Sequence, residues 1–109
     1  MGTAKIEIFS DYQNNIAQLS KVLGHPARVA ILQHLFKINR CVCGDLVLEI
    51  GLAQATISQH LKELKTIGLI QGTVEGTSVC YCINPENWLK MKHTLNDFLN
   101  QETDTPQCC

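Results

Sequence analysis

Apolar residues recur every three or four positions in two segments near the start of the chain. The first segment covers about residues 9–23 and ends at Gly24. The second begins at Pro26, which suits a first helical turn, and runs to about Lys37. This spacing predicts two amphipathic helices. Their apolar positions are Phe9, Tyr12, Ile16, Leu19, Val22, Leu23, Val29, Ile31, Leu32, Leu35 and Phe36.

Shorter elements follow in the middle of the chain. Cys41-Val42-Cys43 is predicted to form a short strand. Asp45 stands where it can cap a helix over 46–50, and Gly51 closes that helix. A longer helix is predicted from residue 53 or 54 to 67, because its apolar residues again fall on one side.

The last third contains two short segments around a turn and then returns to helical spacing. Strands over 69–74 and 78–83 are predicted to form a hairpin around a turn at 75–77. Asn84-Pro85-Glu86 is expected to end the hairpin, and a final amphipathic helix is predicted over 87–101.

Two short helices with a tight glycine-containing turn, followed by a hairpin, indicate a winged helix-turn-helix: a mostly α fold with a small β-hairpin. The composition, 45% hydrophobic and 17% charged, is that of a globular protein. We expect residues 1–109 to form a single domain, with 102–109 as a flexible C-terminal tail.

The predicted helix over 53–67 has two faces. With Ile57 at the centre of the buried side, steps of 100° per residue place small, polar and cationic side chains on the other side. Such a face suits the major groove of DNA, although a merely solvated helix face is the simpler alternative. The residues expected to contact bases are Gln54, Ala55, Thr56, Ser58 and Gln59, and those expected to contact phosphates are Lys62 and Lys65. His60 falls toward the buried flank and is expected to pack or hydrogen-bond.

The net charge of −1 does not by itself indicate a nucleic-acid-binding protein. DNA contact therefore has to come from the placement of nine basic residues rather than from their excess. The predicted turn at 75–77 contains no arginine and one acidic residue, so few phosphate contacts are expected there.

Six cysteines occur as three close pairs: Cys41 with Cys43, Cys80 with Cys82, and Cys108 with Cys109. The chain has neither a signal-peptide pattern nor an apolar run long enough for a membrane span, so we expect a cytoplasmic protein. In a reducing compartment such pairs favour metal or redox chemistry over a structural disulfide framework.

Strand geometry suggests how the thiols meet. Residues two apart on a strand share a face, so each upstream pair presents two thiols on one side. In a winged helix the short first strand usually pairs with the last strand of the hairpin, which would gather four thiols. The alternative is that these cysteines are small buried apolar residues. Packing does not explain Cys108 and Cys109 in a polar tail, so we interpret them as accessible ligands.

Two stretches resemble the ArsR/SmtB family of metalloregulators. They are Lys21-Val-Leu-Gly-His-Pro-Ala-Arg-Val-Ala-Ile-Leu32 and Gly51-Leu-Ala-Gln-Ala-Thr-Ile-Ser-Gln-His-Leu-Lys-Glu-Leu-Lys-Thr-Ile-Gly-Leu-Ile70. The resemblance implies a homodimer joined through its first and last helices, which binds operator DNA and releases it when a metal or metalloid binds. Cys41-Val-Cys43 is similar to the cysteine motif of the family's arsenic and cadmium sensors. The family often has Ser where Ala53 stands, so this chain lacks a favourable cap, worth about 1 kcal/mol.

The resemblance also limits which metal or metalloid ions are expected to act as inducer. Zinc and nickel sensors of the family need several His and carboxylate ligands on the last helix, where this chain has only His93 with Asp97 and Glu102 beyond it. The cadmium and lead type uses thiols from an N-terminal arm, and no cysteine precedes Cys41. An all-thiol site favours As(III) as inducer, with Sb(III) next and Cu(I) also compatible. No organic cofactor is expected.

The sequence thus predicts a non-enzymatic, cytoplasmic transcriptional repressor of an arsenic-resistance type of operon. Its predicted metalloid ligands are Cys41, Cys43, Cys80, Cys82, Cys108 and Cys109. A thiol redox-responsive repressor of the same fold and a winged-helix module that binds only proteins remain as alternatives. A thiol enzyme is disfavoured because the chain has no Cys-x-x-Cys motif.

Overall fold

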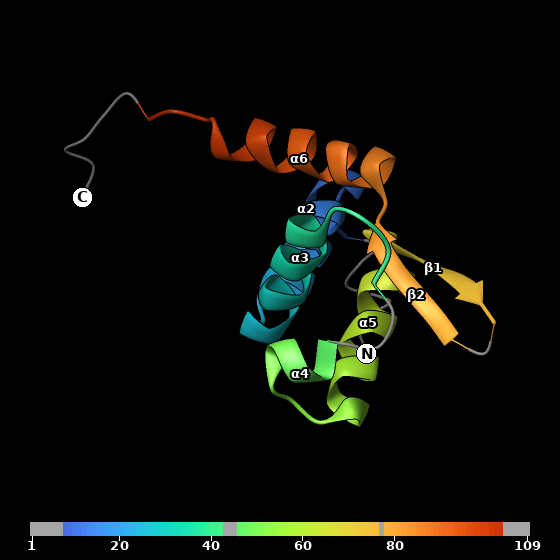
Figure 1. Cartoon of the computed structure of the whole chain (residues 1–109). Helices are drawn as coiled ribbons and strands as arrows, with labels where there is room; N and C mark the ends of the chain where they lie inside the picture. Colours follow the sequence, from blue (N-terminus) through green and yellow to red (C-terminus); the bar gives the residue numbers. More distant parts are fainter. Residues whose placement is uncertain (1–7, 43–45, 77, 104–109) are drawn as a thin grey trace.

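Figure 1 shows a computed structural model that describes residues 8–42, 46–76 and 78–103. Its elements, in chain order, are α2 (Asp11–Leu23), α3 (Pro26–Ile38), α4 (Leu46–Ile50), α5 (Gln54–Thr66), β1 (Ile70–Glu75), β2 (Ser78–Ile83) and α6 (Pro85–Leu99). This order confirms the predicted winged helix-turn-helix, mostly helical with one small hairpin.

Local sequence explains where the helices begin. Ser10 caps α2, because its Oγ accepts from the backbone N–H of Gln13 at 3.1 Å, while the Gln13 side chain accepts from Ser10 N–H at 3.0 Å. Asn84 caps α6 in a similar way, and Pro85 occupies the first turn. The predicted start of the last helix was therefore wrong. The helix begins at Pro85, with Asn84 as its N-cap, two residues before the predicted start at residue 87.

The core lies between α3, α5 and the hairpin. Its most deeply buried apolar side chains are no more than 2% exposed, and burial of each contributes about 1.5–3 kcal/mol. They are Ile31 and Leu35 of α3, Ile57 and Leu64 of α5, Leu69 just before β1, and Ile70 at the start of β1. α3 packs against α2, α4, α5 and β2, so it is the central helix of the domain.

The turn between α4 and α5 has the predicted glycine. Gly51 has φ +84°, a conformation that a β-carbon disfavours, and it ends α4 as expected. Ala53 then stands at the N-cap of α5 in an extended conformation, with no side-chain hydrogen bond to the helix. The missing cap predicted from the sequence is confirmed.

β1 and β2 form the antiparallel hairpin of the wing, with Gln71 opposite Cys82 and Thr73 opposite Cys80. Of the predicted short strand at 41–43, the structure describes residues 41 and 42, and Val42 pairs antiparallel with Tyr81. Val42 N–H donates to Tyr81 O at 2.8 Å, and Tyr81 N–H donates to Val42 O at 2.9 Å. The segment before α4 is therefore attached to the wing, as predicted.

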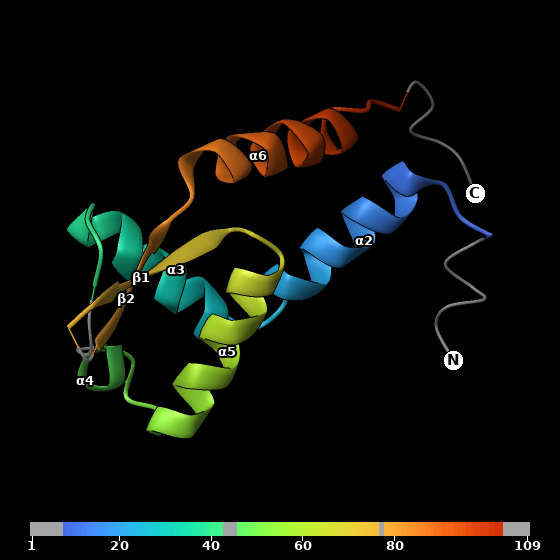
Figure 2. The same cartoon turned by 90° about the vertical axis from the view of Figure 1, so that its right-hand side faces the viewer.

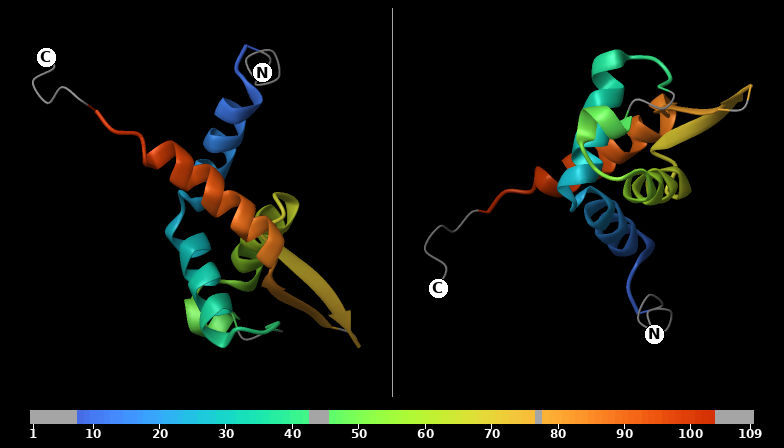
Figure 3. Two further views of the ribbon diagram at one scale, coloured as in Figure 1. Left: turned by 90° about the horizontal axis from the view of Figure 1, so that it is seen from above. Right: turned by 60° about the horizontal axis from the view of Figure 1, so that its bottom comes forward.

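α2 and α6 lie together at the end of the molecule away from α4, and α6 crosses over α2 (Figures 2 and 3). Tyr12 Oη of α2 donates to Asp97 Oδ2 of α6 at 3.1 Å. Large apolar side chains are exposed on both elements and just before α2: Phe9 before α2, Tyr12 in α2, and Leu89, Phe98 and Leu99 in α6. None of the described helices has the length and apolarity of a membrane span.

Candidate nucleic-acid interface and thiol site

The predicted DNA-binding residues share the solvent-facing side of α5. The opposite side is buried through Ile57, Leu61 and Leu64, so the predicted division of the helix into two faces is confirmed. Exposed side chains are those of Gln54, Ala55, Thr56, Ser58, Gln59, Lys62 and Lys65. α5 lies beside α4 in the helix-turn-helix, at the side of the domain away from α6 (Figure 1). Contact of this face with DNA stays a prediction.

Two amides on this face are held by hydrogen bonds one helical turn away. Gln54 Nε2 donates to Ser58 Oγ at 3.0 Å. Gln59 Nε2 donates to Glu63 Oε2 at 3.2 Å. Both bonds use one amide hydrogen and leave the carbonyl oxygen of the amide for another partner.

Arg28 of α3 connects the central helix to α5. Its Nε donates to His60 Nδ1 at 3.1 Å, and its Nη2 pairs with Glu63 Oε1. Its Nη1 also donates to the carbonyl oxygens of Lys21 and Val22, both at 3.3 Å. Sequence reasoning missed this cluster, because nothing in the local pattern relates residues 28 and 63.

His60 is a buried hydrogen-bonding residue, as predicted, with 6% of its surface exposed. Its ring lies 4.4 Å from that of His25. Burial lowers the pKa of His60, and the nearby His25 and Arg28 lower it further. The neutral imidazole can therefore accept the Arg28 hydrogen bond. The pKa of Glu63 is also lowered, first by the hydrogen bond from Gln59 and then by the charge of Arg28.

Two thiols of the predicted sensor site, Cys80 and Cys82, lie on β2, the last strand of the wing. Because Val42 pairs with Tyr81, the antiparallel register brings Cys41 opposite Cys82. Both residues are half-buried. Cys82 is a free thiol, and its Sγ accepts a weak hydrogen bond from Gln71 Nε2 at 3.8 Å. Cys80 is fully buried at 0% exposure and is disulfide-bonded.

Not all predicted ligands can be placed. Cys43, Cys108 and Cys109 lie outside the described residues. Within residues 8–42, 46–76 and 78–103, no three His, Cys, Asp or Glu side chains are grouped so that they could hold a metal ion. The described part of the chain thus brings Cys41 and Cys82 together but does not complete a three-thiol site.

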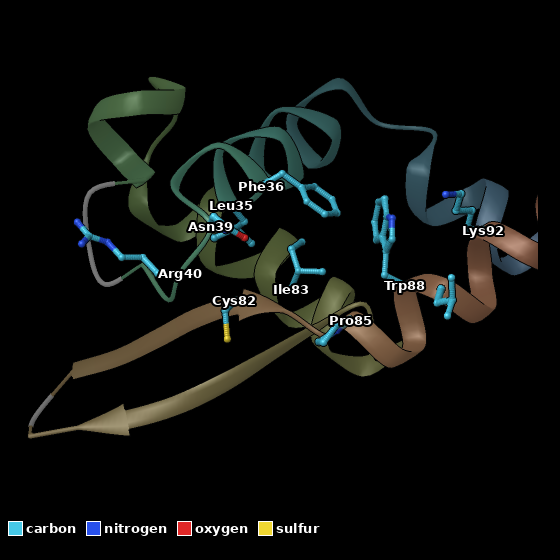
Figure 4. Close-up of a pocket in the computed structure, with 10 residues that line it drawn as sticks. Leu35, Phe36, Asn39, Arg40, Cys82, Ile83, Pro85, Trp88 and Lys92 are labelled. Atoms are coloured by element: carbon cyan, nitrogen blue, oxygen red, sulfur yellow. The ribbon is translucent and has the colours of Figure 1, made fainter.

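A pocket of about 430 Å³ adjoins Cys82, between α3, β2 and α6. The Phe36 and Trp88 rings line it edge to face, with centroids 4.7 Å apart. Figure 4 shows Ile83 directed toward these rings and Cys82 directed to the other side of β2. The Cys82 side chain therefore lies on the face of β2 away from these rings.

Comparison with known proteins accounts for this architecture. Residues 25–71, which contain α3, the helix-turn-helix and the start of β1, match the family model described as bacterial regulatory protein, arsR family. HTH-type transcriptional regulator CmtR of Mycobacterium bovis is 34% identical over 95 residues, covering 86% of this chain and 80% of CmtR. The chain belongs to the arsR family. This confirms the predicted resemblance. Because the family is described as one of regulatory proteins, it also agrees with the prediction of a non-enzymatic protein.

Another relative is nodulation protein NolR of Rhizobium meliloti, 30% identical over 82 residues. That match covers 75% of this chain but 66% of NolR, so the chain spans slightly less than two thirds of this longer relative.

Several solved structures share the fold of this chain. Rv0081 of Mycobacterium tuberculosis aligns with a TM-score of 0.66 and 26% identity, covering 84% of this chain and 91% of that protein. The protein described as the cadmium metal-sensor CmtR of M. tuberculosis aligns at 0.51 with 28% identity, covering 85% and 97%. The domain described as homodimeric, Mb0332 of M. bovis, aligns at 0.61 with 22% identity, covering 89% and 97%.

Proposed function

We propose that this protein is a homodimeric transcriptional repressor that binds operator DNA through α5 and releases it when As(III) binds cysteine thiolates. The observation that carries this proposal is the bridge between Val42 and Tyr81. Through it, Cys41 and Cys82 come opposite each other where the wing meets the segment leading into the helix-turn-helix. A thiol-binding ion at that point acts directly on the DNA-binding elements.

The exposed face of α5 supports DNA binding. Its base-contacting residues would be Gln54, Ala55, Thr56, Ser58 and Gln59, with Lys62 and Lys65 on phosphates. A homodimer would present two such helices to half-sites about 34 Å apart, or a multiple of that distance. Because few basic side chains take part, the salt dependence of binding should be shallow for its class.

Exposed apolar side chains of α2 and α6 support dimerisation, since a lone domain rarely leaves such a patch in water. A substitution of Leu99, which is 70% exposed, by Asp would place a charge in the proposed interface. We expect the wild type to sediment as a dimer at micromolar concentration and Leu99→Asp as a monomer. Val74→Asp, at a position 74% exposed in the wing, is the matched control and should stay dimeric. A monomeric wild type would contradict this part of the proposal.

The chemistry of the thiols supports a soft inducer. As(III) prefers a small number of thiolate ligands, and Sb(III) is chemically similar. Cys41 and Cys82 would supply two ligands and a further cysteine the third: Cys43, Cys80, Cys108 or Cys109. Cys80 would have to be reduced first. The similarity to CmtR, a cadmium sensor by its description, agrees with a thiol-bound inducer but does not select arsenic.

Release requires that the ion bind more tightly to the form that does not bind DNA. A coupling free energy of about 1–3 kcal/mol would weaken DNA binding by roughly 5- to 150-fold. Ligands on both sides of the bridge would fix the wing relative to α4 and α5. The form selected in this way would have its wing or recognition helix displaced from the DNA groove.

A second candidate is a thiol redox switch, and the disulfide at Cys80 favours it. In that case two thiols would lose two electrons and two protons to a peroxide, forming one disulfide and reducing the peroxide to two hydroxyl products. Operator affinity would then depend on the oxidation state of the protein without any metalloid.

Fluorescence anisotropy of labelled operator DNA, selected from random duplexes by the reduced protein, tests both candidates. Arsenite added under a phosphine reductant should release DNA from the wild type. Each of the six single Cys→Ser variants should still bind DNA, and variants at true ligands should lose release. Release by peroxide but not by arsenite would support the redox switch instead. Arsenite release from all six variants at the wild-type concentration would refute the metalloid site.

A further inference from the structure

Glu63 contacts both Gln59, on the exposed face of α5, and Arg28 of α3. One carboxylate oxygen of Glu63 accepts from Gln59 Nε2, and the other pairs with the Arg28 guanidinium. Arg28 is itself fixed by His60 Nδ1 and by the two carbonyl oxygens at the end of α2. Gln59 is therefore connected, through Glu63, to a donor on the central helix of the domain.

This arrangement determines which way the Gln59 amide faces. A carboxylate only accepts hydrogen bonds, so it selects the NH₂ end of the amide rather than the carbonyl end. The lowered pKa of Glu63, due first to the Gln59 hydrogen bond, agrees with a carboxylate that stays ionised near neutral pH. One amide hydrogen is used, and the second hydrogen and the carbonyl oxygen remain available.

An adenine edge in the major groove needs that remaining pair. Its N7 accepts one hydrogen bond and its N6 amino group donates one, and glutamine can satisfy both together. An amide in the reversed orientation could not form this pair of hydrogen bonds, and a freely rotating amide could form it only part of the time. Losing rotamer freedom before binding also reduces the entropy that the side chain has to lose on the DNA.

We propose that Arg28 and Glu63 are positioning residues for DNA sequence readout, which orient Gln59 to form a paired hydrogen bond with adenine. Neither residue needs to contact DNA for this role. The proposal rests on the proposed function of α5 as the DNA-recognition helix. It adds two specificity residues outside the predicted contact set, one of them on a different helix.

The test compares operator duplexes that differ at one base pair. Each adenine of the operator in turn is replaced by 7-deazaadenine, which keeps Watson–Crick pairing but lacks the N7 acceptor. The quantity measured is the ratio of the two dissociation constants. Removing an acidic residue strengthens binding to the phosphates of any duplex, whatever its sequence. This gain affects both dissociation constants equally, so it cancels in their ratio. Glu49→Ala on α4, where the side chain is exposed, is the matched charge control.

The wild type and Glu49→Ala should prefer adenine by about fivefold or more at one position, and Gln59→Ala should lose that preference. Glu63→Ala and Arg28→Met should lose most of it at the same position. The double variant Gln59→Ala/Glu63→Ala should match Gln59→Ala to within about twofold. Thermal unfolding of each variant, monitored by circular dichroism, identifies any loss that comes from misfolding, and Glu63→Gln supplies a second, milder change at the same position.

The outcomes separate the two proposals. If Gln59→Ala keeps the full preference at every adenine, the assignment of the α5 face is wrong. If Gln59→Ala loses the preference but folded Glu63→Ala, Glu63→Gln and Arg28→Met all keep it, the positioning role is overturned while the DNA-binding face stands.

Discussion

The uncapped start of α5 allows a stabilising substitution to be predicted. Ala53 already has the extended backbone of an N-cap, with φ −61° and ψ 151°, and its carbonyl accepts from Ile57 N–H at 3.0 Å. Only the side-chain acceptor is missing. The hydroxyl oxygen introduced by Ala53→Ser should accept from a backbone N–H in the first turn without moving the chain.

The magnitude follows from the number of groups involved. One backbone N–H in the first turn of α5 gains a side-chain acceptor, which is worth about 1 kcal/mol at a helix N-cap. For a domain of this size, that gain corresponds to an increase in Tm of roughly 4 °C. Ser10 and Asn84, which make such bonds at 3.1 Å in the same molecule, show that the geometry is attainable.

Urea and thermal unfolding at one fixed protomer concentration would measure the change, since dimerisation makes Tm depend on concentration. Ala53→Val is the control, because valine suits the extended backbone but offers no acceptor. If Ala53→Ser is no more stable than Ala53→Val, the capping argument for α5 is wrong.

Two further predictions concern a buried histidine and a tight glycine. Folding lowers the pKa of His60 from its ordinary value of 6.5. The contribution of the neutral imidazole to the free energy of unfolding is therefore complete above about pH 6.5 and decreases as the pH falls below that value. Unfolding in urea between about pH 7 and 5 should show this slope in the wild type and in His93→Gln, whereas His60→Gln should flatten it. Gly68 has φ +90°, and an added Cβ would lie 2.7 Å from Asn87 Nδ2, while Gly76 has φ +64° and open space around it. Gly68→Ala should therefore lower the free energy of unfolding more than Gly76→Ala, which costs about 1 kcal/mol of backbone strain, and equal losses would contradict the steric account.

Local sequence patterns predicted those elements whose causes are local. The helix over Leu46–Ile50 and the strand over Ser78–Ile83 were predicted with the observed bounds, because a positive-φ glycine ends the helix and turn-forming residues precede and follow the strand. The α6 start was misplaced because Asn84 and Pro85 suit a turn as well as a helix N-terminus. Here the neighbouring Asn87 N–H supplies the capping bond.

The site was predictable only in part. Periodicity identified the exposed face of α5 and the buried position of His60, since both depend on helix geometry alone. The contact of Arg28 with Glu63 joins residues 35 positions apart, and it depends on how α3 packs across α5. The pairing of Val42 with Tyr81 was expected from the fold, whereas the oxidation state of Cys80 depends on packing and redox conditions that no sequence pattern encodes.

The bridge between Val42 and Tyr81 also has a consequence for hydrogen exchange. The hairpin is held by a continuous ladder from Ile70–Ile83 to Glu75–Ser78, and in the part of the chain that the structure describes Val42 is joined to it by one pair of backbone hydrogen bonds. A single pair of backbone hydrogen bonds can open while both the hairpin and the core remain folded. The Val42 amide should therefore exchange with deuterated water through a local opening, faster than the amides of the hairpin ladder. A metalloid or a disulfide across this junction would suppress that opening, so its protection factor would report the signalling state in the absence of DNA.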